Sequence, residues 1–448
     1  MAERLKAAVL KTVRARVLVG SNPTPSDAAL RLIVCCGLGF IVAASVLAVV
    51  AHPAQHPWLE VAAYIVLAGC GLAGAAALWS RTDRSALAIM LAVAALARIV
   101  FVFKAPFLSD DLYRYLWDGK MLLTGINPYV HAPDMIATAS FHASWLYPHL
   151  YWHHWPSLYP PLDLALFALA YWIDGTGIIA IKSFVELGDA GALALLIVAL
   201  RGRGLPVGRA ALYAWSPLAI LEFAWSGHEE VWCAAALIAA VLLYDRRKLS
   251  AAGAALAAAI LTKLYPLAFV PLFFARRAWR AVAMCLGCVA VAYLPFYLWN
   301  HDILGFLHDF ASRFQFNDTL YIALGENGAA ALFATAVLAA FFARMRGVGL
   351  VETLVFVLLA YLLLAPTVWP WYLAGFVALL PLAPTAFEGA MRPLTFGILG
   401  WIAIAPLGYA SEASTAAHVL EYVPVALGIA FSLRSLLATR APALEPAR

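Results

Sequence analysis

Charged residues are scarce in this chain. Of its 448 residues, 12% are charged and 64% are hydrophobic, and the mean hydropathy is +0.85. Soluble domains carry about 25% charged residues, so this deficit excludes a soluble globular protein. The chain also lacks the segments of about 10 residues with alternating polarity that a membrane β-barrel requires. Its apolar runs can cross about 30 Å of hydrocarbon as helices, so the sequence predicts an all-α polytopic membrane protein.

Other absences narrow the function. There is no glycine-rich loop for nucleotide phosphates, and no internal repeat of the kind common in secondary transporters. Residues 1–26 are basic and polar, so we expect no cleavable signal peptide. The six cysteines lie in or beside apolar stretches, and we expect them to pack as small hydrophobic residues without disulfides. The net charge of +5 comes from short clusters between apolar runs, which indicates membrane topology rather than nucleic-acid binding.

The basic clusters set the expected topology, because Lys and Arg prefer the cytoplasmic side. Placing all of them inside predicts roughly 11–14 spans with both termini in the cytoplasm. We expect a cytoplasmic segment at 1–31, a transmembrane domain at 32–434 with an outer loop at 105–160, and a cytoplasmic tail at 435–448. The apolar segment 161–173 does not fit this alternation, so we expect it to cross only half of the membrane. Residues 249–275 form either two short spans or one kinked helix.

This topology gathers the polar residues on one side of the membrane. Five segments fall on the outer face together with all eleven histidines: 105–160, 227–230, 263–266, 300–327 and 367–372. Interfacial belts explain the aromatic residues there, but not the acids and histidines. We therefore expect the chemistry of this protein at the outer membrane surface.

The strongest motif follows the third apolar segment and contains Asp110 and Asp111. A partly desolvated carboxylate beside another acid has a raised pKa, which suits a general base. A capping pair on a solvated helix is the alternative. Residues 111–120 are expected to be helical, with Ser109 or Asp111 as N-cap. The spacing then places Asp111 on one face with Arg114, Tyr115 and Asp118.

A turn and a histidine pair follow. Gly125 is expected just past the helix end, and Pro128 blocks continuation. His153 and His154 lack a third ligand at convincing spacing, so interfacial packing is favoured over a metal site.

Three further polar positions stand between apolar flanks. Ionisable residues within the membrane often mark functional sites. The Gly227-His-Glu-Glu230 block is therefore a candidate functional site, and a helix cap is the alternative role for it. Lys263 either extends to the interface or binds a phosphate as a point charge. Arg313 is a second candidate anion ligand. Lys182 and Glu186, four residues apart, are expected to form an internal ion pair.

At these residues the sequence resembles a known family. The stretch Ser109-Asp-Asp-Leu-Tyr-Arg-Tyr-Leu-Trp-Asp118, followed by Gly125-Ile-Asn-Pro-Tyr129, is similar to the first outer loop of GT-C fold glycosyltransferases. Bacterial mannosyltransferases that use polyprenyl-phosphate-mannose are the most similar. The resemblance spans about 105–375 and includes four more blocks: Tyr159-Pro-Pro-Leu162, Gly227-His-Glu-Glu230, Lys263-Leu-Tyr-Pro266 and Trp369-Pro-Trp-Tyr372.

The resemblance implies a multi-pass inner-membrane enzyme of the cell envelope. Its reaction would be the inverting transfer of a hexose, expected to be mannose, from a polyprenyl-phosphate donor to the hydroxyl of a glycolipid, glycan or other acceptor at the periplasmic face. No cofactor is implied, and a divalent metal is left open. Asp110 matches the family's first acidic position, so Asp110 or its neighbour Asp111 would be the base.

The resemblance also suggests binding residues. Lys263, Arg313 and His228 would hold the donor phosphate. The substrate-binding candidates are Arg114, Tyr115, Asp118, Tyr159, Glu230, Asn317, Trp371 and Tyr372. The chain departs from the family in three ways. Its two acids, Asp110 and Asp111, are adjacent, whereas the family has them spaced, and it has Glu229-Glu230 where Asn-Asp is usual. Two apolar segments precede the catalytic loop, where family members often have one.

A transporter or flippase of a lipid-linked sugar is the alternative function, and a non-catalytic membrane scaffold is a third. A transporter needs polar residues along a path through the midplane. Lys182, Glu186 and Asp189 lie within a span, but the outer boundary is richer in polar residues. This distribution favours a transferase, and a scaffold leaves the paired acids unexplained.

Overall fold

The computed structural model describes residues 27–50, 57–106, 109–409 and 415–440. Most of the predicted segment 1–31 and part of the predicted tail lie outside the described residues. Within them the fold is all-helical, which confirms the predicted class, and one isolated parallel bridge joins Phe316 to Thr367. Eight helical segments are long and apolar enough to cross a membrane. Seven of them lie in α2 (Asp27–Val50), α3 (Pro57–Leu78), α4 (Arg84–Val102), α7 (Ile179–Gly202), α13 (Trp279–Asn300), α15 (Thr319–Met345) and α19 (Thr415–Arg440). The eighth, Gly389–Gly408, consists of α18 (Arg392–Ile404) and the 3-10 turns on either side of it.

Several shorter helices complete the bundle. They are α6 (Pro161–Ile173), α10 (Glu230–Asp245), α11 (Leu249–Ile260), α12 (Val270–Phe274), α16 (Leu350–Leu364) and α17 (Ala374–Leu379). Residues 249–275, expected to be two spans or one kinked helix, form α11 and α12 with a break and a 3-10 turn at Tyr265–Phe269 between them. Pro266 and Pro271 remove backbone donors at this break, which a continuous helix would need.

The apolar segment 210–225 is not one helix. It consists of α8 (Ala211–Ala214), α9 (Pro217–Ala219) and a π-helical turn, η4 (Ile220–Trp225). Pro217 prevents a continuous ladder, and the Ser226 amide donates to the Leu221 carbonyl at 2.9 Å, the five-residue spacing of a π-turn. The segment is buried throughout, so tertiary packing compensates for its broken backbone.

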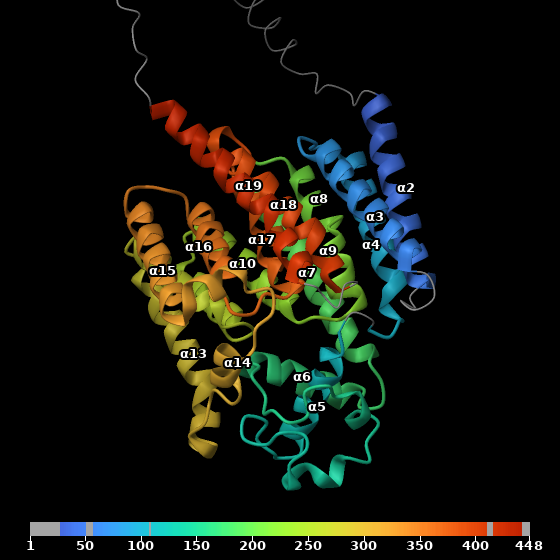
Figure 1. Cartoon of the computed structure of the whole chain (residues 1–448), viewed down its shortest axis with the longest axis vertical. Coiled ribbons are helices and arrows are strands. Elements are labelled where there is room, and N and C mark those ends of the chain that lie inside the picture. Colours follow the sequence, from blue (N-terminus) through green and yellow to red (C-terminus); the bar gives the residue numbers. More distant parts are fainter. Residues whose placement is uncertain (1–26, 51–56, 107–108, 410–414, 441–448) are drawn as a thin grey trace, which may run out of the picture.

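The long helices place both described ends of the chain at one end of the molecule (Figure 1). The start of α2 and the end of α19 lie there, and the loop with α5 (Asp111–Leu123) and α6 lies at the opposite end. This agrees with the predicted shared sidedness of the termini. The helix α6 packs against α5, and with 13 residues it is too short to belong to the eight candidate spans.

The outer loop has its own hydrophobic core. Leu112, Tyr115 and Trp117 of α5 pack with Leu146 and with Phe167 of α6, all of them buried. Each such side chain contributes about 1.5–3 kcal/mol when fully buried. Gly119 lets the two helices approach closely, because a Cβ there would lie 2.4 Å from the backbone of Phe167. The loop is therefore a packed platform.

The turn after α5 is as predicted. Gly125 has φ +77° and its amide donates to Leu122, while the Ile126 amide donates to Met121 at 2.9 Å. These two bonds form a Schellman motif.

The expected ion pair between Lys182 and Glu186 does not form. The Lys182 ammonium instead donates to the carbonyls of Phe101 and Lys104, at 2.8 and 2.7 Å. Nearby, Arg98 pairs with Asp189, which also accepts the Tyr213 hydroxyl at 2.7 Å. Arg98 and Asp189 thus form a matched pair, whereas Glu186 keeps a buried carboxylate oxygen without a hydrogen-bond partner.

All six cysteines are free, as the sequence predicted.

Candidate active site

The first turn of α5 separates the two adjacent acids. Asp110 is the N-cap residue, is exposed, and makes no side-chain capping bond. Asp111 is half-buried, and its amide donates to the Ser109 hydroxyl at 3.2 Å. The prediction of Ser109 or Asp111 as N-cap is therefore wrong, although the Ser109 hydroxyl accepts one amide of the first turn. Asp111 is the acid of the pair that turns toward the interior.

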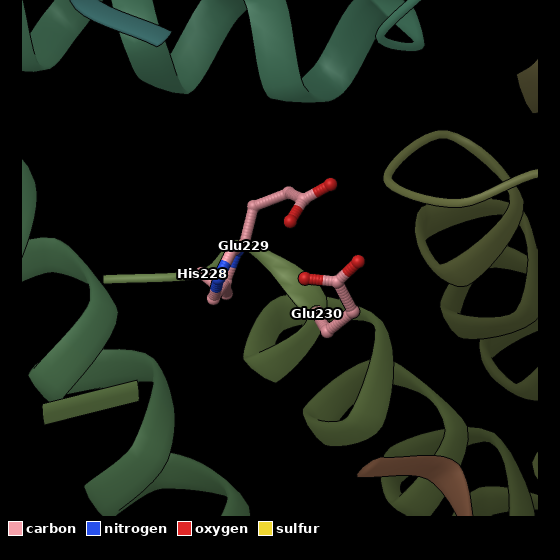
Figure 2. A group of neighbouring side chains, drawn as sticks. All are labelled: His228, Glu229 and Glu230. Carbon is pink, nitrogen blue, oxygen red and sulfur yellow. The ribbon is translucent and has the colours of Figure 1, made fainter. Parts of the chain in front are cut away.

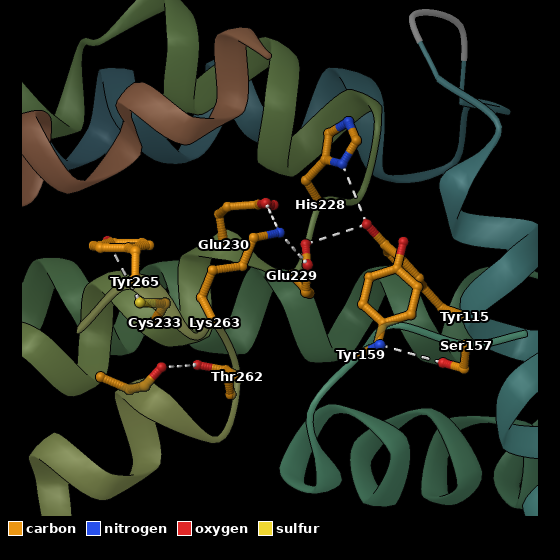
Figure 3. A network of polar contacts seen from close by, with 11 residues as sticks. Tyr115, Ser157, Tyr159, His228, Glu229, Glu230, Cys233, Thr262, Lys263 and Tyr265 are labelled. Atoms are coloured by element: carbon orange, nitrogen blue, oxygen red, sulfur yellow. Dashed lines mark hydrogen bonds and ion pairs between the residues drawn. The ribbon is translucent and has the colours of Figure 1, made fainter. Parts of the chain in front are cut away.

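The face of α5 behind Asp111 carries the expected residues. Arg114 pairs with Asp118 at 2.8 Å and donates to the Trp152 carbonyl at 2.9 Å. Both side chains are buried, so this pair ties α5 to the outer loop. Tyr115, one turn into the helix, directs its hydroxyl at the segment before α10 (Figure 3).

That segment, 226–230, joins the π-turn to α10. Gly227 has φ +79°, and a Cβ there would lie 2.5 Å from Leu112 of α5, so only glycine fits. The Tyr115 hydroxyl lies 3.3 Å from Nδ1 of His228 and 3.2 Å from Oε2 of Glu229. The carboxyl groups of Glu229 and Glu230 stand near each other at the start of α10 (Figure 2).

Lys263 supplies the positive charge of this cluster. It follows α11, and its ammonium contacts Oε1 of Glu229 at 2.8 Å and the carboxylate of Glu230. It also lies 5.0 Å from the ring centroid of Tyr372. Trp371 stacks on His228 with ring centroids 3.9 Å apart. Five segments far apart in sequence thus meet here: the start of α5, Tyr159, residues 226–230, Lys263 and residues 371–372.

The electrostatics of the cluster suit proton transfer. Burial and the negative charge of Glu229 together raise the pKa of Asp111 to about 6, against the opposing charges of Lys263 and Arg114. A carboxylate with such a pKa is ionised near neutral pH and is a stronger base than an ordinary Asp.

The three residues His228, Glu229 and Glu230 have ligand atoms within 4.8 Å of one another, a spacing that a metal ion requires. The Lys263 ammonium, however, contacts both carboxylates. An ammonium there opposes a second cation, so we assign the positive charge to Lys263 and no metal-ligand role to this group.

Residues 27–281 match a family model described as alpha-(1->6)-mannopyranosyltransferase, N-terminal domain. The chain belongs to this mannosyltransferase family. Comparisons with curated proteins and with solved structures found no match. The matched range contains α5, residues 226–230 and Lys263, so most of the buried cluster belongs to the mannosyltransferase domain.

Two of the residues predicted for this mannosyltransferase site lie apart from the cluster. Arg313, at the end of α14 (Leu307–Arg313), has a side chain 66% exposed and pairs with Asp309 at 3.0 Å. Asn317 is buried, and its amide donates to Glu421 at 2.7 Å. Asn317 therefore anchors an outer segment to α19. Its neighbour Phe316 stacks on Trp369.

Two buried acids near the mannosyltransferase cluster were not predicted. Glu222 of the π-turn lies against His228, and Asp163 in the first turn of α6 is fully buried with neither carboxylate oxygen hydrogen-bonded. Each is a single acid in an apolar segment of the sequence. Both acids could have been recognised from the sequence, because an ionisable residue in an apolar membrane segment is energetically costly and often functional.

Proposed function

We propose that this mannosyltransferase transfers mannose from a polyprenyl-phosphate donor to an acceptor hydroxyl at the outer face of the inner membrane, with inversion at the anomeric carbon. An Asp of the outer loop would accept the hydroxyl proton as the oxygen attacks, and the lipid phosphate would leave. The family description supports an α-(1→6) product. A single inverting displacement yields an α product only from a β-linked donor.

The observation that carries this proposal is the position of Asp111. It lies half-buried at the rim of the cluster formed by Lys263, Glu229 and Tyr115, with a pKa of about 6. Asp110 was the first choice from the sequence, and burial raises its pKa too. Asp111 is preferred because it is less exposed and the charge of Glu229 adds to the effect of burial on its pKa.

The donor phosphate needs a cation that is not already neutralised. Lys263 is 17% exposed and contacts two carboxylates, so its charge is less available than the sequence suggested. Arg313 is exposed and pairs only within its own helix. Arg313 is therefore the better candidate for the phosphate, since an exposed i, i+4 pair contributes little and is readily exchanged.

The alternative, a lipid-sugar transporter, receives less support. Three of the charged residues within the bundle make close contacts, because Arg98 is paired to Asp189 and Lys182 is bound to backbone carbonyls. Such pairing favours a structural role over a polar path.

The test uses purified protein with a mannoside acceptor and either polyprenyl-phosphate-mannose or a nucleotide-linked mannose. The proposal predicts equal amounts of mannosylated product and released polyprenyl phosphate with the lipid donor, and no product with the nucleotide donor. Transfer from the nucleotide donor alone would overturn it.

A further inference from the structure

Glu421 is a buried acid near the start of α19 to which the proposed reaction assigns no part. It lies within the candidate span 419–438 and is 4% exposed. A buried acid inside a membrane span is energetically costly and often has a function. Its Oε2 accepts from the side-chain amide of Asn317 at 2.7 Å, and the hydroxyl of the neighbouring Tyr422 donates to the Asn317 carbonyl. Two adjacent residues of α19 therefore hold one residue of a distant outer segment.

Asn317 is suited to this position by its backbone as well as by its side chain. Its φ of +57° lies in the left-handed region, which Asn and Asp tolerate better than most residues. Glycine would also fit this backbone, but it has no side-chain donor for Glu421. Residue 317 is thus a point at which the chain turns and is fastened at the same time.

The segment 314–317, which we call the strap, follows Arg313 directly and joins the outer loop to α19. At its start the ring of Phe314 packs edge-on against Trp152 of the outer loop, with centroids 4.9 Å apart. At its end Asn317 is held by α19. The position of Arg313 at the end of α14 therefore depends on a segment that is fastened at both ends.

The middle of the strap contacts the segment that carries the aromatic residues of the cluster. The Phe316 carbonyl accepts from the Val368 amide at 2.8 Å, and its ring stacks on Trp369 with centroids 3.7 Å apart. Trp369 is parallel to Trp371 at 5.1 Å, and Trp371 in turn stacks on His228. A row of stacked rings thus connects the strap to the buried cluster.

We propose that Glu421 is a positioning residue for the donor site. By holding Asn317 it anchors the strap, and the strap keeps Arg313 beside the row of rings that leads to the cluster. The strap and α19 both lie beyond residues 27–281, the range of the family match, so the C-terminal part of the chain supplies this anchor. Its effect on the donor rests on the proposed function, in which Arg313 binds the phosphate, whereas the anchoring of the strap does not.

The first test exchanges the two partners and measures the KM for polyprenyl-phosphate-mannose. Asn317→Asp keeps the tolerated backbone but removes the donor, so the KM should rise about tenfold or more, the value of a charge-assisted contact. Glu421→Gln keeps an acceptor oxygen, so its KM should stay within about threefold of wild type. The double variant Asn317→Asp/Glu421→Gln reverses donor and acceptor and should restore the KM. Turnover at saturating donor should stay within about threefold throughout, because Asp111 is unchanged.

The second test measures hydrogen exchange at the Phe316 and Val368 amides in the full chain in lipid nanodiscs, without donor. These amides form the backbone bonds between the strap and residues 366–368. Exchange should be faster in Asn317→Asp and return to the wild-type rate in the double variant. Asn300→Asp is the control, because it adds the same charge at an exposed position at the end of α13 and should change neither exchange nor KM.

Unchanged exchange in Asn317→Asp, or fast exchange in the double variant, would overturn the anchor, even in a protein for which no mannosyl transfer is found. Exchange that follows the cycle while the donor KM does not would overturn the role in donor binding. If Asn317→Asp does not fold, the double variant decides, because an exchanged pair restores the contact whereas two independent lesions add. Absence of transfer from the lipid donor in wild type would overturn the proposed function instead.

Discussion

Replacing Asp111 by Asn tests the proposed base with almost no change in shape. The amide keeps the size of the side chain but cannot accept the acceptor's proton. General-base catalysis contributes about 10²–10⁴-fold, so turnover should fall by that factor. Donor affinity should be unchanged, because this substitution removes no cation that could bind the donor phosphate.

The structure also predicts the effect of this change on stability. Burial and Glu229 raise the pKa of Asp111 to about 6, so the ionised form is disfavoured in the folded protein by roughly 3 kcal/mol relative to the unfolded chain. This penalty is absent below the unfolded pKa near 4 and is complete above about pH 6. Asn carries no charge, so at pH 7 the variant should melt at the same temperature as wild type or higher.

The assay is release of polyprenyl phosphate at saturating donor, with thermal unfolding measured on the same samples. Asp110→Asn is the matched control, because this neighbour is exposed and makes no capping bond. It should change turnover by no more than about twofold, as surface substitutions usually do. Normal turnover in Asp111→Asn would refute the assignment of Asp111 as the base. If Asp110→Asn were inactive in the same assay, Asp110 would be the base instead.

Four further predictions concern the pH dependence, the ion pairs, the donor phosphate and the topology. Because Asp111 must be ionised, kcat/KM should fall about tenfold per pH unit below about pH 6, and a flat profile would remove it as base. Lys263→Met leaves two buried carboxylates without their cation and should cost about 3–5 kcal/mol in unfolding free energy, so an unchanged Tm would contradict the ion pairs. Arg313→Gln should weaken donor binding roughly 10- to 150-fold with an unchanged Tm, and unchanged donor affinity would remove Arg313 as phosphate ligand. An impermeant thiol reagent added to intact cells should label Ser140→Cys but not Ser250→Cys, and the reverse pattern would invert the topology.

Local signals in the sequence predicted the parts of the site that depend on neighbours in the chain. The helix after Asp110, the turn at Gly125 and the shared face of Arg114, Tyr115 and Asp118 follow from capping, glycine conformation and helical spacing. The distribution of basic residues predicted that the polar segments lie at one end of the molecule, because Lys and Arg favour one side of the membrane for each whole loop.

Tertiary packing decided the rest. Sequence spacing could not determine which of two adjacent acids faces inward, since that depends on where α5 packs. Lys263 looked like an isolated cation, but α10 brings Glu229 and Glu230 to it. Lys182 found carbonyls at the end of α4 instead of the acid one turn away. Each outcome depends on a segment far away in the chain, which no local pattern reports.

The central claim is that mannosyl transfer occurs at the buried cluster below the outer loop. A polyprenyl-phosphate-mannose analogue with a photoreactive group on the sugar tests this directly, with adducts mapped by mass spectrometry. We predict adducts within residues 109–118, 226–230 and 369–372, and competition by unmodified donor. Adducts confined to the basic pocket at the opposite end, lined by Arg247, Lys248 and Arg280, would contradict the account.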